Sequence, residues 1–120
     1  MRTALALALA ALLPGLANAQ ENAEQGVGAV LRGLEKVSGD IVDMTLSPGD
    51  AARIGPLTVE LRECRYPQGD PAADAFAFLT IRDETVAEPI FSGWMVASSP
   101  ALNALDHPRF DVWVLRCRTE

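Results

Sequence analysis

Residues 57–64 read Leu-Thr-Val-Glu-Leu-Arg-Glu-Cys, and this stretch decides the fold class. Its first five positions alternate apolar and polar side chains, a period of two that is typical of a β-strand with one buried face. Cys64 lies three positions after Leu61 and falls on the opposite face of an unbroken strand. A Cys64 that is bridged in the core therefore requires a β-bulge near Arg62 and Glu63.

Strand character continues on both sides of this stretch. Residues 42–46 alternate in the same way and are followed by a turn cluster at residues 47–50. The run 75–81 is apolar on both faces, which suits a central strand. Further extended runs are expected at residues 89–96 and 110–117.

The helical signal is short. Ser99 and Pro100 match the N-cap and first position of a helix, and residues 101–105 then allow about a turn and a half. No long helical pattern separates the predicted strands, which disfavours a parallel α/β fold. We expect a mainly β fold: a small antiparallel β-sandwich or barrel of five to six strands with one short helix.

The N-terminal residues have the order of a secretory signal peptide. Arg2 precedes ten apolar residues at positions 4–13, and Ala17-Asn18-Ala19 forms an A-x-A cleavage site. Ten apolar residues are too few to span a bilayer, which needs about 20. No cysteine follows that could carry a lipid. We expect cleavage after Ala19 and a soluble product without stable membrane insertion.

The remaining chain divides into two parts. Residues 20–30 are polar and rich in glycine, which predicts a flexible lead-in with too little apolar surface to fold. Val30, Leu31, Leu34 and Val37 suit one turn of helix or an irregular docking segment. Residues 31–120 are long enough for a single domain with its own core.

The chain contains two cysteines, Cys64 and Cys117. In an oxidising compartment such a pair is expected to form a disulfide. The bridge would tie the end of the 57–64 strand to the end of the last strand. The alternative is two buried free thiols.

Composition disfavours several classes of ligand. The formal net charge is −6, and an acidic protein is repelled by the phosphates of nucleic acids and anionic membranes. One histidine, without Cys-x-x-Cys, His-x-x-x-His or calcium-loop spacing, predicts no metal site. No glycine-rich phosphate loop is present. We therefore expect no cofactor and no nucleic-acid partner.

His107 is the single histidine of the chain, and Asp106 precedes it. A serine hydrolase needs Ser, His and a carboxylate that converge in space, and the chain has no Gly-x-Ser-x-Gly elbow. The sequence therefore favours a structural role, in which Asp106 satisfies backbone N–H groups beside the Pro108 turn.

Four aromatic residues flank the predicted short helix. Phe91 and Phe110 are expected in the core. Trp94 and Trp113 suit either a core or an exposed binding surface, because tryptophan is frequent in both.

Five segments together resemble the DUF2155 family of uncharacterised, exported alphaproteobacterial proteins. They are residues 34–39 (Leu-Glu-Lys-Val-Ser-Gly), 64–67 (Cys-Arg-Tyr-Pro), 91–95 (Phe-Ser-Gly-Trp-Met), 99–108 (Ser-Pro-Ala-Leu-Asn-Ala-Leu-Asp-His-Pro) and 110–113 (Phe-Asp-Val-Trp). The resemblance extends over residues 31–117, with Glu35 and Ser38 in place of the usual Asp and Thr. It implies an exported protein of a Gram-negative host but no reaction.

Two functions follow from these observations. The first is a soluble periplasmic binding or adaptor module for an unknown protein or envelope component, without catalytic residues. Its candidate surface comprises Trp94, Trp113, Asp106 and His107. The alternative is a small periplasmic hydrolase or ligand-modifying enzyme that uses His107 and Asp106. A purely structural role in the envelope is a third possibility.

Overall fold

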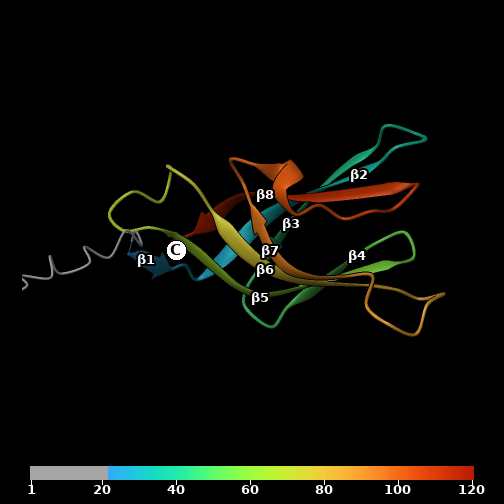
Figure 1. The fold of residues 1–120 in the computed structure, drawn as a ribbon, viewed down its shortest axis with the longest axis horizontal. Helices are drawn as coiled ribbons and strands as arrows, with labels where there is room; N and C mark the ends of the chain where they lie inside the picture. Colours follow the sequence, from blue (N-terminus) through green and yellow to red (C-terminus); the bar gives the residue numbers. More distant parts are fainter. Residues whose placement is uncertain (1–21) are drawn as a thin grey trace, which may run out of the picture.

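The computed structural model describes residues 22–120, which form two antiparallel β-sheets (Figure 1). The first sheet has the strand order β1–β5–β6–β7, with β4 also paired to β5, and the second has the order β3–β2–β8. The strands are β1 (Ala23–Gln25), β2 (Gly28–Glu35), β3 (Ile41–Leu46), β4 (Ala51–Ile54), β5 (Leu57–Pro67), β6 (Phe76–Asp83), β7 (Phe91–Val96) and β8 (Phe110–Arg118). The predicted signal peptide, residues 1–19, lies outside the described residues.

The strand β5 follows the alternation that the sequence predicted. Leu57, Val59 and Leu61 have no exposed surface, because their side chains point into the core. The pairing register with β6 then shifts between Leu61 and Glu63, and this places Cys64 in the core as well. The predicted β-bulge is confirmed.

A disulfide joins the two sheets. Cys64 on β5 is bonded to Cys117 on β8, with their Cα atoms 5.6 Å apart, as the sequence predicted. The inward side chains of both sheets belong to one hydrophobic cluster, which includes Phe91 and Phe110. Both phenylalanines therefore lie in the core, as expected.

The structure confirms the mainly β class and changes two details. The described residues contain eight strands, not five to six. The expected helix is a single 3-10 turn, η1 (Pro100–Leu102), and the Ser99 side chain makes no capping hydrogen bond. None of the residues of η1 is buried, so this turn lacks the packed apolar face that stabilises a longer helix.

The flexible lead-in expected for residues 20–30 is corrected where the structure describes it. Residues 23–25 pair with β5, and residues 28–35 form the central strand β2 in place of a helical turn. The prediction failed because the buried side of β2 uses small residues. Ala29 and Gly33 point inward, and a side chain at Gly33 would collide with Ile54.

No helix among residues 22–120 is both long and apolar enough to cross a membrane.

Candidate functional site

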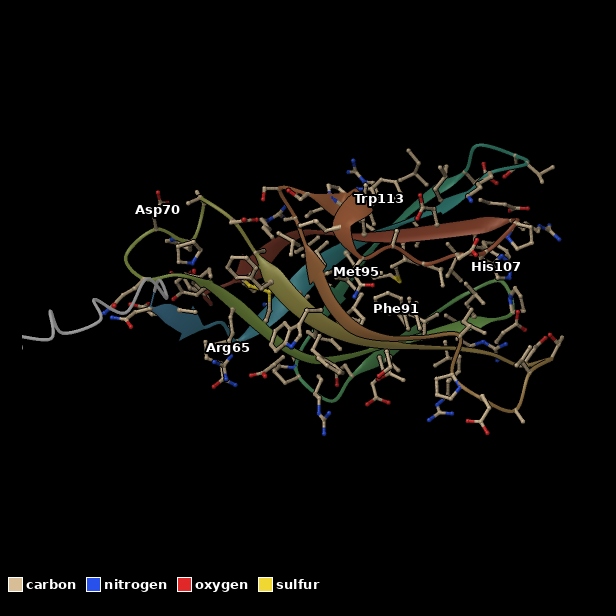
Figure 2. All side chains as sticks on the ribbon, viewed as in Figure 1. Arg65, Asp70, Phe91, Met95, His107 and Trp113 are labelled. Carbon is tan, nitrogen blue, oxygen red and sulfur yellow. A yellow bond between two sulfur atoms is a disulfide. The ribbon has the colours of Figure 1, made fainter. Side chains whose placement is uncertain are left out.

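The structure does not bring the four candidate surface residues together. Trp94 on β7 points away from the core of the first sheet, because its neighbour Met95 points inward. Trp113 on β8 points away from the core of the second sheet, between the buried Val112 and Val114. In Figure 2, Trp113 lies beside η1 on one side of the molecule and His107 lies at one end.

Trp94 belongs to an aromatic cluster on the outer face of the first sheet. It is the direct cross-strand neighbour of Phe78, and the two rings meet edge to face with centroids 5.4 Å apart. The Arg62 guanidinium lies 5.4 Å from the centroid of the Phe78 ring, which is cation–π geometry. Trp94 remains 37% exposed, and Arg62 is also exposed.

A shallow hollow opens beside this cluster. It has a volume of about 260 Å³ and is lined by Ala23, Arg65, Phe76 and Trp94. We call the surface formed by Arg62, Arg65, Phe76, Phe78 and Trp94 the Trp94 face. Figure 2 shows Arg65 beneath β5, on the side of the molecule opposite Trp113.

The edge of the Trp94 face is held by the segment that follows β7. Asn103 donates a hydrogen bond from Nδ2 to the Trp94 carbonyl oxygen at 2.9 Å. Gly93 lets this segment approach closely, since a side chain there would meet the Asn103 amide. Such contacts protect the edge strand and fix the backbone that carries Trp94.

His107 is bound on both ring nitrogens. Nδ1 accepts hydrogen bonds from the backbone N–H groups of Arg109 and Phe110, at 3.0 and 3.1 Å. Because Nδ1 accepts both bonds, the neutral ring carries its proton on Nε2. Nε2 lies 3.3 Å from Oδ2 of Asp83. The histidine therefore connects the start of β8 to the end of β6.

The carboxylate partner of His107 is Asp83 and not its sequence neighbour. Asp106 is exposed, and among the described residues no hydrogen bond joins it to His107. Asp83 is buried and accepts hydrogen bonds from the Thr85 backbone N–H and hydroxyl, at 3.0 and 2.8 Å. A signal for Asp83 was present in the sequence, because it continues the inward positions of Leu79 and Ile81.

The surroundings of Asp83 favour its charged form. The two hydrogen bonds from Thr85 lower the pKa of Asp83 below its usual value, and the contact with His107 adds to this effect. Burial acts in the opposite direction but is outweighed. Within residues 22–120, no group of three or more His, Cys, Asp or Glu side chains is placed to hold a metal ion.

Replacing His107 by alanine is expected to lower the free energy of unfolding by about 1–3 kcal/mol, because two backbone N–H groups lose their acceptor. His107→Asn should retain part of this stability, since its Oδ1 can occupy the place of Nδ1. Urea unfolding of the three proteins measures the difference. Equal midpoints for wild type and His107→Ala would show that these contacts contribute nothing to stability.

Acid is expected to destabilise the protein partly through Asp83. Because folding lowers the pKa of this carboxyl, its contribution is complete above the usual value of about 4 and declines as the pH falls through the folded value. The melting temperature of Asp83→Asn should therefore fall less steeply between pH 5 and pH 2 than that of wild type. The exposed Asp106→Asn is the control, and an equal slope for Asp83→Asn would contradict the assignment.

Comparison with known proteins gives a family but no function. Residues 29–117 match the family model described as "Uncharacterized protein conserved in bacteria (DUF2155)". An uncharacterized protein from Rickettsia prowazekii (strain Madrid E) is 25% identical over 87 residues, which cover 70% of this chain and 56% of the relative. The chain thus spans about half the length of the curated relative it matches. No solved structure gives a significant match.

Proposed function

Because the chain belongs to the DUF2155 family of uncharacterized bacterial proteins, its relatives supply no reaction, and we propose from the structure that it is a non-catalytic binding module. The proposed binding surface is the Trp94 face. We further propose that the protein works in the periplasm as an adaptor for another protein. The predicted signal peptide and the Cys64–Cys117 bridge support this location, since disulfides persist in oxidising compartments.

The observation that carries the proposal is the exposed Trp94 on a sheet face that also holds Phe78 and Arg62. Tryptophan and arginine are enriched among the few residues that dominate binding energy at protein interfaces. Leaving the apolar surface of such a ring in water costs about 25 cal/mol per Å², which a partner would recover. A partner that covers the Trp94 ring would remove this cost, which is why the exposed ring favours a binding role.

The hydrogen bonds of His107 do not favour the enzyme alternative. A general base needs a ring nitrogen within reach of the proton that it removes. Here Nδ1 is held by two backbone donors and Nε2 faces Asp83. We therefore assign His107 a structural role and propose no reaction for Asp106.

We also infer that the two sheets are the layers of a small sandwich and not a barrel. The inference is supported by the pairing of the strands, because no ladder joins the first sheet to the second among the described residues. The shared hydrophobic cluster and the bridge between β5 and β8 connect the layers instead.

Site-specific photo-crosslinking in the native host tests the binding proposal. Ser92 is exposed on β7 two positions before Trp94, and it pairs with Thr80 on β6. A photoreactive amino acid at Ser92 should therefore give a discrete crosslinked product. The same probe at the exposed Thr45, on the other sheet, is the control and should not give this product.

In the same experiment, Trp94→Ala should abolish the Ser92 product without changing the melting temperature by more than a few degrees. Loss of a central interface tryptophan costs about 2 kcal/mol or more, or roughly thirtyfold in affinity. A Ser92 product that persists in Trp94→Ala, or the absence of any Ser92 product, would overturn the proposed function.

A further inference from the structure

Resting on the proposed function, we propose that the Trp94 face binds a short acidic segment of another protein. One apolar side chain of this segment would occupy the hollow beside Trp94, and its carboxylates would lie against Arg62 and Arg65. Three independent features of the face lead to this partner: its charge, its size and its hollow.

The outer face of the first sheet is basic, although the protein as a whole is acidic. The chain carries a formal net charge of −6. The charged residues that point outward from β4, β5 and β6 are nevertheless four arginines and two glutamates; they are Arg53, Glu60, Arg62, Glu63, Arg65 and Arg82. Arg53 is paired with Glu84, so the excess positive charge lies with Arg62, Arg65 and Arg82. Complementary charge on the partner is therefore negative, and such complementarity steers association and sets its specificity.

Two of the face arginines can receive carboxylates. Arg62 stacks on Phe78 and has no carboxylate within ion-pair distance among residues 22–120. Arg65 contacts Glu63 two positions away on the same strand, at 3.2 Å, and both groups reach solvent. An exposed pair of this kind contributes little, so Arg65 can exchange it for a carboxylate of the partner.

The size of the face favours a segment over a folded domain. Three strands spaced about 4.8 Å apart and about seven residues long give an area on the order of 300 Å². A stable interface between folded proteins buries about 800 Å² on each partner. An extended segment fits the smaller area.

The hollow supplies an anchor point for such a segment. It is an open depression of about 260 Å³ that is lined by Ala23, Arg65, Phe76 and Trp94. Apolar anchors in pockets carry much of the energy of peptide recognition, and flanking charges provide its specificity.

The same charges argue against a polyanion surface. Glu60 and Glu63 interrupt the positive charge, so no continuous basic stripe is available to a membrane or a nucleic acid. We therefore favour an acidic polypeptide.

Selection from a random phage-displayed peptide library on the exported, oxidised protein tests this inference. The selected peptides are expected to be rich in Asp and Glu around an apolar residue. Their affinity should fall about tenfold or more in Arg62→Glu and in Trp94→Ala, and it should weaken with added salt. Arg116→Glu makes the same charge change on β8 and should alter the affinity by no more than about twofold.

Several outcomes would overturn the inference. They are selected peptides that are neutral or basic, equal effects of Arg62→Glu and Arg116→Glu, or Trp94-dependent binding to phosphatidylglycerol vesicles in place of peptides. If the Ser92 crosslink still depends on Trp94 in any of these cases, the binding function stands and only its acidic partner is wrong. If that crosslink is also absent, both proposals fail.

Discussion

Replacing both Cys64 and Cys117 by alanine is expected to lower the free energy of unfolding by about 4 kcal/mol. The bridge spans a sequence separation of 53 residues and connects β5 in the first sheet to β8 in the second. A cross-link of this length removes much of the freedom of the unfolded chain, and the loss of that constraint favours unfolding. Ordinary domains have a net stability of about 5–15 kcal/mol, so the effect is a large share of the total.

Urea unfolding of the oxidised wild type and of the Cys64→Ala/Cys117→Ala protein measures this loss. Wild type whose bridge is kept reduced by dithiothreitol should unfold close to the double variant, which separates the cross-link from the change of side chains. Mass spectrometry should find no alkylatable thiol in the native protein. A loss below about 1 kcal/mol would mean that the bridge is offset by strain or by a compact unfolded state.

Truncating Phe110 to alanine is expected to cost about 3–5 kcal/mol, the range for a buried phenylalanine whose site cannot collapse. Phe110 is 3% exposed and begins β8. Its ring packs on Gly55, whose φ of +53° and lack of a side chain make room for it. The His107 ring, which accepts the Phe110 backbone N–H, lies beside it with centroids 5.5 Å apart.

A double-mutant cycle with Gly55→Ala isolates this contact. Gly55→Ala alone is destabilising, because an added side chain would collide with the Phe110 ring and the backbone there is left-handed. In Phe110→Ala the collision disappears, so the double variant should cost less than the sum of the single variants. Additive losses would show that the ring and Gly55 do not interact as described.

The strands that the sequence predicted have large apolar side chains, which either alternate with polar ones or run continuously. The continuous run became β6, a central strand whose outward Phe76 and Phe78 are only half-buried. In β5, Leu57, Val59 and Leu61 repeat with a period of two and are buried as expected. The missed strand β2 has Ala29 and Gly33 on its inward side. Met44 on β3 and Ile54 on β4 of the other sheet fill the space at Gly33. Small residues do not produce a hydrophobic periodicity in the sequence. Their inward position therefore becomes visible only in the packing of the two sheets.

The site was less predictable than the fold because its contacts cross between strands. The sequence offered Asp106 as the neighbour of His107, whereas the folded chain supplies Asp83, which lies 24 positions earlier. Alternation along β8 left open which face of the strand is the inner one. In the structure Val112 and Val114 are buried and Trp113 points outward. Local patterns cannot specify which side chains two distant strands bring together.

The pairing of β2 with β8 also sets the order in which the chain can fold. Gly28 pairs with Arg118 and Glu35 pairs with Phe110, so the second sheet joins the two ends of the described chain. Such non-local contacts slow folding into roughly the millisecond-to-second range, and this sheet cannot be completed before residue 118 has been synthesised. The second sheet therefore stays incomplete throughout synthesis, whereas all strands of the first sheet are present once residue 96 has been made.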